Sequence, residues 1–136
     1  MPNDATTAIR RLRVHSGLAA GPGGFLEMLR PYRGLDMGVV TDLAACVVGV
    51  LPLLRNPTVD RELMNDLWGT LHWGRHWGLH PRGMLRSNNL ITEADQATLD
   101  AWLTAMGWAI AMTLDGQDRA SAVGELTDLG LDCGEA

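Results

Sequence analysis

Apolar residues recur at intervals of three and four along most of this chain, which is the repeat of an α-helix. The clearest example covers residues 92–114. Its apolar positions are Leu99, Trp102, Leu103, Met106, Ile110 and Leu114. No stretch alternates as a half-buried strand does. The pattern therefore predicts an all-α protein.

Capping residues and helix breakers divide this pattern into segments. Asp36, Thr58, Thr92 and Asp118 are of the types that cap helix starts, and Pro52 and Pro81 end or kink a helix. We expect five or six helices at about residues 5–16, 24–30, 36–52, 58–80, 92–114 and 118–129. Short loops between them favour an antiparallel-type bundle. At 136 residues the chain fits a single domain over residues 1–136, with frayed tails at 1–3 and 131–136.

Residues 37–54 form the one run apolar enough to resemble a membrane span. The run contains Asp42 and Pro52, and its length only just reaches that of a span. A buried core helix explains it better, so no membrane association is expected.

Charge is unevenly distributed along the chain. All eleven basic residues are arginine, and residues 91–136 hold nine acidic residues against Arg119 alone. So acidic a segment repels nucleic acid and attracts a basic protein surface. We therefore expect a protein partner with a basic surface and no nucleic acid.

Two groups of residues are candidates for binding this partner. One is the acidic C-terminal third, and the other is the arginine- and asparagine-containing loop between the two longest helices. A solvated helix face and an ordinary turn explain them about as well. The candidates are Asp115, Asp118, Glu125, Asp128, Asp132, Arg82, Arg86 and Asn88.

The segment LHWGRHWGLHPRG, residues 71–83, places His72, His76 and His80 four residues apart on one helical stripe. Neighbouring pairs have a spacing that lets two imidazoles reach one ion. On a straight helix, however, the outer two lie about 12 Å apart, so the three cannot share an ion. No acid or thiol occurs between Leu67 and Thr92. We therefore expect partly buried, hydrogen-bonded histidines and no cofactor, with metal or haem binding by His72 and His76 as the alternative.

The glycines of the same segment are costly in a helix interior and so point to close packing. Gly74 and Gly78 are one turn apart and predict a notch beside Trp73 and Trp77. We expect tryptophan rings to fill such notches between this helix and residues 92–114, which carry Trp102, Gly107 and Trp108. Gly74→Leu should then disrupt the fold, whereas His76→Gln should be mild. A ligand pocket lined by tryptophan is the alternative.

No phosphate loop, nucleophile elbow or paired-thiol motif occurs, and Cys46 lies in an apolar run typical of an inert core thiol. Two cysteines without a motif spacing fit a reduced cytoplasmic protein. The sequence thus predicts a small cytoplasmic, non-enzymatic protein-binding module, such as an immunity protein or inhibitor of a basic toxin or enzyme. The alternatives are the metal- or haem-binding protein and a homo-oligomeric module, such as a homodimer, joined through the glycine and tryptophan surface.

Overall fold

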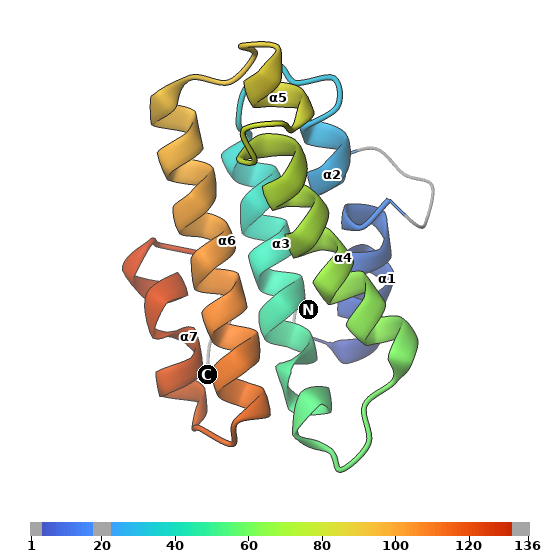
Figure 1. Ribbon diagram of the computed structural model, residues 1–136. Coiled ribbons are helices and arrows are strands. Elements are labelled where there is room, and N and C mark those ends of the chain that lie inside the picture. Colours follow the sequence, from blue (N-terminus) through green and yellow to red (C-terminus); the bar gives the residue numbers. More distant parts are fainter. Residues whose placement is uncertain (1–3, 18–22, 132–136) are drawn as a thin grey trace.

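The computed structural model describes residues 4–17 and 23–131 and shows an all-α bundle, which confirms the predicted fold class (Figure 1). The described residues form seven α-helices and one 3₁₀ turn. These are α1 (Ala5–His15), α2 (Phe25–Met28), α3 (Met37–Val50), η1 (Leu51–Arg55), α4 (Arg61–Gly78), α5 (Met84–Ser87), α6 (Glu93–Leu114) and α7 (Arg119–Asp128).

Three of the predicted helix caps are confirmed, and the predicted cap of α4 is wrong. The side chains of Asp36, Thr92 and Asp118 each accept a hydrogen bond from a backbone N–H of the following turn. Thr58 does not cap α4. That position belongs to Asp60, whose carboxylate accepts a 3.0 Å bond from the Leu63 N–H. An aspartate two residues farther along offers the stronger acceptor, so α4 starts later than expected.

Helix α3 lies at the centre of the bundle, behind α4 and α6 in Figure 1. Together with η1 it is long and apolar enough to pass for a membrane span, but most of its residues are buried by the other helices. It is therefore the core helix that the sequence favoured. The α-helix ends at Val50, and the chain continues as a 3₁₀ turn containing Pro52 because proline cannot supply the next helical N–H.

Two short features lie outside the predicted helices. Residues 82–89 were expected to form only a connection, yet Met84–Ser87 make one helical turn that buries Leu85. At the other end, Leu131 is fully buried and its N–H bonds to the Leu126 carbonyl. The fold therefore extends through residue 131, one residue into the expected tail; residues 1–3 and 132–136 lie outside the described part.

The glycine notches on α4 exist, but aliphatic and phenyl side chains fill them instead of tryptophan. A Cβ on Gly74 would lie 2.9 Å from Phe25 and 3.4 Å from Leu103, and a Cβ on Gly78 would overlap Leu99. The prediction of close packing at these glycines is confirmed. The prediction that tryptophan fills the notches is wrong, because the glycines face the core while Trp73 points outward.

Candidate functional site

A groove between α6 and α7 brings together two of the predicted acidic residues. It is a hollow of about 460 Å³ whose wall on α7 carries Glu125 and Asp128. Its floor on α6 consists of small residues one turn apart, Ala97 and Ala101. The complete lining is Ala97, Asp100, Ala101, Thr104, Glu125, Asp128 and Leu129. We call this surface the α6–α7 groove.

The carboxylates of the groove differ in their pairing. Asp100 accepts a 2.7 Å bond from Arg75, whose other terminal nitrogen donates to Thr104 at 2.9 Å. Glu125 and Asp128 form no salt bridge with any residue in the described ranges. Their charge is therefore directed to solvent and to whatever enters the groove.

A second hollow of about 340 Å³ continues the groove along α6. It shares Ala97 and Asp100 with the α6–α7 groove and adds Arg75 and Arg86. The Arg86 guanidinium donates to the Leu79 carbonyl at 3.0 Å and so lies across the end of α4. The continuous surface is thus basic at the end near α5 and acidic at the end near α7.

The other predicted partner-binding residues lie elsewhere. Asp115 and Asp118 belong to the turn between α6 and α7, where Asp118 caps α7 through a 2.8 Å bond from the Ser121 N–H. This bond lowers the pKa of Asp118. Asn88 donates to the Met84 carbonyl within α5. Asp132 lies outside the described residues.

The turn after α4, which the sequence offered as a binding loop or an ordinary turn, is held by hydrogen bonds among its own residues. The guanidinium that bonds a carbonyl there belongs to Arg86, whereas Arg82 contributes its backbone N–H, which donates to Nδ1 of His80 at 3.0 Å. Asn89 has a φ of 55°, as expected for an asparagine in such a turn.

His72, His76 and His80 are exposed, which corrects the expectation that they are partly buried. Ring centroids are 6.2 Å apart for His72 and His76 and 5.1 Å apart for His76 and His80. Together with Arg75 and Leu79 they line a surface hollow of about 300 Å³. The glycines turn the opposite face of α4 to the core, so this stripe faces outward.

The tryptophans of α4 and α6 do not pack against each other's glycines. Trp73 is 45% exposed and lies against Trp77, over which the Arg30 guanidinium sits at 5.5 Å. Trp108 donates its indole N–H to the Ser121 carbonyl at 3.0 Å and so joins α6 to α7. Neither Trp73, Trp77 nor Trp108 lines any of the four hollows described in this section.

A buried polar cluster that the sequence did not reveal joins α1 to α3. Fully buried His15 contacts the Asp42 carboxylate at 2.7 Å, and Arg11 donates to the same oxygen at 2.8 Å. The Phe25 N–H donates to Nδ1 of His15 at 3.0 Å. Nδ1 is therefore unprotonated, and Nε2 carries the proton that it donates to Asp42. Burial lowers the pKa of His15.

The same cluster has the composition of a metal site, since Cys46 completes a group with His15 and Asp42. Two contacts argue against an ion there. A metal on Nε2 of His15 would require a proton on Nδ1, which would face the Phe25 N–H donor. The Arg11 guanidinium on Asp42 would also repel a cation. The cluster is a structural hydrogen-bond network.

A second buried acid joins α1 to α4. Asp66 is 1% exposed, and burial raises its pKa. Its carboxylate oxygens lie 3.4 Å from the Ser16 hydroxyl and 3.6 Å from Arg13. These contacts are long, so the charge of Asp66 is only weakly compensated.

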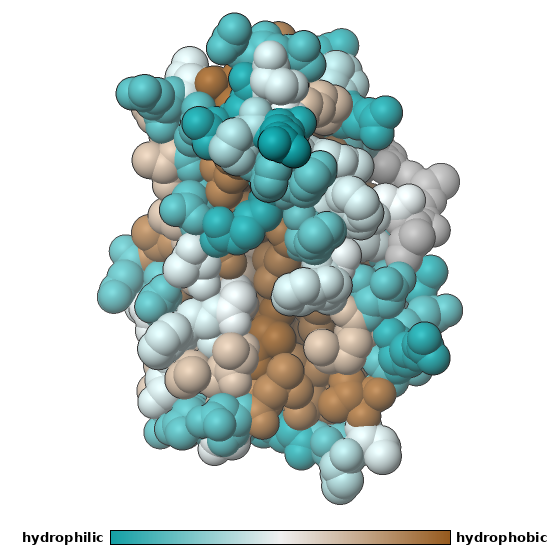
Figure 2. All heavy atoms as spheres, in the orientation of Figure 1, coloured by the Kyte–Doolittle hydropathy of each residue, from teal (hydrophilic) through white to brown (hydrophobic). Residues whose placement is uncertain are grey.

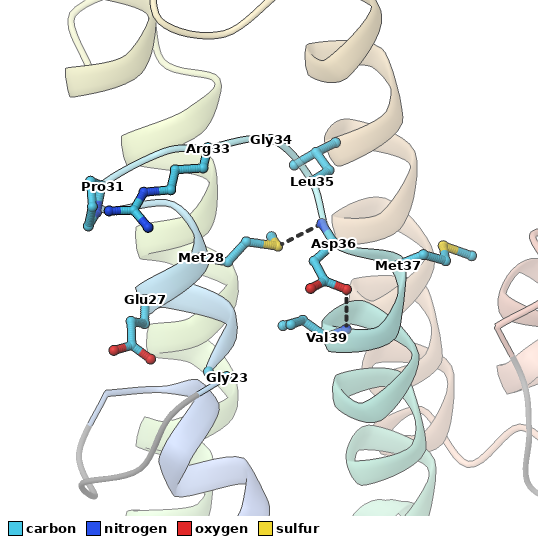
Figure 3. Close-up of a pocket in the computed structure, with 11 residues that line it drawn as sticks. Gly23, Glu27, Met28, Pro31, Arg33, Gly34, Leu35, Asp36, Met37 and Val39 are labelled. Carbon is cyan, nitrogen blue, oxygen red and sulfur yellow. Dashed lines mark hydrogen bonds between the residues drawn. The ribbon is translucent and has the colours of Figure 1, made fainter.

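The most voluminous of these hollows, about 750 Å³, lies between α2 and the start of α3 (Figure 3). Asp36 is engaged in capping α3, and its N–H donates to the Met28 sulfur. In Figure 3 the Glu27 side chain points away from Asp36, and Arg33 lies along the loop toward Pro31. The charged groups do not converge on one point, as a catalytic constellation would require.

A strip of half-buried and exposed apolar side chains follows the seam between α4 and α6 and consists of Met64, Trp68, Leu71 and Leu114. Leu71 lies beside Gly107, and positions two turns farther along each helix, Met64 and Leu114, face the same seam. Trp68 is 67% and Leu114 49% exposed. Figure 2 shows a larger area of hydrophobic atoms in the lower half of this face than in the upper half, which is mostly hydrophilic. We call the four side chains of the seam the apolar strip.

The sequence did not identify the small residues of the groove floor. Ala97 and Ala101 are exposed although they are apolar, and Asp100 lies between them. Their spacing of four on a helix with a buried opposite face was the available signal. Only the placement of α7 turns that face into a groove.

The chain matches no protein-family model, no curated protein and no solved structure. The function must therefore be argued from the chain's own geometry.

Proposed function

We propose that this chain is a non-enzymatic, cytoplasmic protein-binding module whose α6–α7 groove receives a basic segment of a partner protein. The activity that fits best is that of an inhibitor, such as an immunity protein that occupies a basic toxin or enzyme. The observation that carries the proposal is a pair of carboxylates, Glu125 and Asp128, which lie above small residues and have no salt bridge to residues 4–17 or 23–131.

The groove suits a helix or extended segment with arginine or lysine side chains. Alanines at 97 and 101 allow a partner backbone to approach α6 closely. The described residues 91–131 carry seven acidic residues and one basic residue, Arg119. This negative charge would attract the basic segment of the partner toward the groove before contact. Arg86, at the other end of the surface, would pair with an acidic residue of the partner and fix its direction.

The test uses the protein encoded beside this chain's gene, since inhibitors are commonly encoded next to their targets. Its affinity for the chain is measured by calorimetry. The double variant Glu125→Arg/Asp128→Arg should weaken binding at least about a hundredfold, because like charges would then meet in the groove. Asp115→Arg is the matched control, since Asp115 lies in the turn outside the groove.

Binding that survives the double reversal, or falls equally with Asp115→Arg, would contradict the proposal. A neighbouring product that forms no complex would contradict the inhibitor assignment.

The apolar strip supports a second candidate, self-association as a homodimer. Its exposed Trp68 and Leu114 are of the type that anchors interfaces. Light scattering should give twice the chain mass for the wild type and the monomer mass for Trp68→Arg. A wild-type monomer at high concentration would exclude this candidate.

A further inference from the structure

We propose that His72 and His76 together bind one divalent transition-metal ion, of the Zn²⁺ or Cu²⁺ class, on the outer face of α4. This site is separate from the α6–α7 groove and does not depend on the proposed function.

The two imidazoles are free to act as ligands. Neither ring makes a hydrogen bond with any residue in the described ranges, and both rings are exposed, so little desolvation opposes an incoming ion. The rings are 15° from parallel, so at least one of them has to rotate about its Cβ–Cγ bond before both nitrogen lone pairs point at one ion. Neutral imidazole is a preferred ligand for Zn²⁺, Cu²⁺ and Ni²⁺, and its nitrogen needs no carboxylate partner to bind them.

The separation of the rings is close to that of a chelate. Two imidazoles on one tetrahedral ion, with metal–nitrogen bonds of about 2.0 Å, have centroids about 5 Å apart. The observed 6.2 Å therefore requires a closure of about 1 Å, which rotation of two exposed side chains can supply. Water would complete the coordination.

Trp73 orients both ligands. Its ring lies edge-on to His72 at 4.8 Å and to His76 at 5.8 Å, so the two imidazoles share one wall. The neighbouring Arg75 is held toward α6 by Asp100 and Thr104, and its charge is compensated there. Arg75 lines the same hollow as the histidines, but its pairing with Asp100 reduces its repulsion of an incoming ion.

His80 is the third histidine of the stripe, but it is poorly prepared to bind. Its Nδ1 accepts the Arg82 N–H, which leaves the proton on Nε2, the nitrogen that would otherwise reach the ion. The hollow is shallow, and Leu79 is its one apolar lining residue, so it suits an ion and does not enclose a haem.

The test is a calorimetric titration of the full chain with ZnCl₂ near neutral pH. The expected result is one Zn²⁺ per chain, with affinity reduced at least about tenfold by His72→Gln or His76→Gln and changed less than about twofold by His80→Gln. His80→Gln is the matched control because it removes an exposed histidine one turn away. Circular dichroism of each variant checks that the fold is retained.

A second readout follows fluorescence. Bound Cu²⁺ should quench emission from Trp68 and Trp73, whose rings both lie against His72, and the saturable quenching should be lost in His72→Gln and in His76→Gln but kept in His80→Gln. Zn²⁺ binding that is not saturable, that falls equally in all three histidine variants, or that falls most with His80→Gln would overturn the proposal.

Discussion

The buried His15 network makes a sharp prediction about pH. Burial lowers the pKa of His15 in the folded chain, whereas the same side chain in the unfolded chain has its ordinary pKa of 6.5. As the pH falls from 7.5 to 5.5, the unfolded state therefore takes up more protons than the folded state. The contribution of His15 to stability must therefore decrease over this range.

The size of the decrease follows from linkage. An unfolded histidine of pKa 6.5 that gains a proton which the folded chain does not gain lowers the free energy of unfolding by at most about 1.4 kcal/mol between these two pH values. The geometry explains why protonation is opposed. A proton on Nδ1 would face the Phe25 N–H at 3.0 Å, and Arg11 lies on the same carboxylate as Nε2.

The assay is urea unfolding at pH 7.5 and 5.5 of the wild type and His15→Gln. Glutamine can donate to Asp42 and accept from the Phe25 N–H without titrating in this range. The exposed histidines are present in both proteins, so their contributions cancel in the comparison. The wild type should lose up to about 1.4 kcal/mol more than the variant. An equal loss in both proteins would refute the assigned protonation state.

Three other substitutions, each with a control variant, test the helix packing and the buried charge of Asp66. Gly78→Ala should lower the free energy of unfolding by about 1–3 kcal/mol, because its methyl group would overlap Leu99. Its control, Gly69→Ala, should raise that free energy by about 0.5–1 kcal/mol, because its Cβ would meet only Trp73 at 4.0 Å. Equal effects of the two variants in thermal unfolding would contradict close packing at Gly78. In urea unfolding, Leu131→Ala should lower the free energy of unfolding by about 2–5 kcal/mol because Leu131 is buried. Leu129 is half-exposed, so Leu129→Ala should lower it by about 0.5 kcal/mol or less. No effect of Leu131→Ala would mean that residue 131 does not belong to the core. Asp66→Asn should raise the melting temperature at pH 7, because it removes a buried charge that is only weakly compensated. Glu62→Gln, at an exposed carboxylate, is the control. A lower melting temperature for Asp66→Asn would contradict a destabilising charge at Asp66.

The helices could be predicted from the sequence because their signals are local. Asp36, Thr92 and Asp118 cap helices through bonds to the next turn, and Pro52 stops a helix by lacking an N–H. These effects need no knowledge of distant residues. The start of α4 was missed because two acceptors, Thr58 and Asp60, competed within three residues.

The contacts between helices could not be predicted in the same way. The glycines of α4 indicated close packing, but the sequence could not show that Phe25, Leu99 and Leu103 would fill the notches. Likewise, His15 and Asp42 are 27 residues apart, and only the packing of α1 on α3 brings them together. Long-range pairings of this kind carry no periodic signal.

The candidate site could likewise be predicted from the sequence only in part. The excess of acid in the C-terminal third was evident from composition, whereas the separation of Glu125 and Asp128 from Asp115 and Asp118 depends on how α7 turns against α6. The exposed floor residue Ala97 gains a role only through that placement.

Hydrogen exchange of the chain with and without its bound partner shows whether the partner occupies the α6–α7 groove. Binding in the groove should slow exchange at residues 97–104 and 125–129 and leave residues 115–118 unchanged. Protection confined to the turn at 115–118, or to α4, would contradict it.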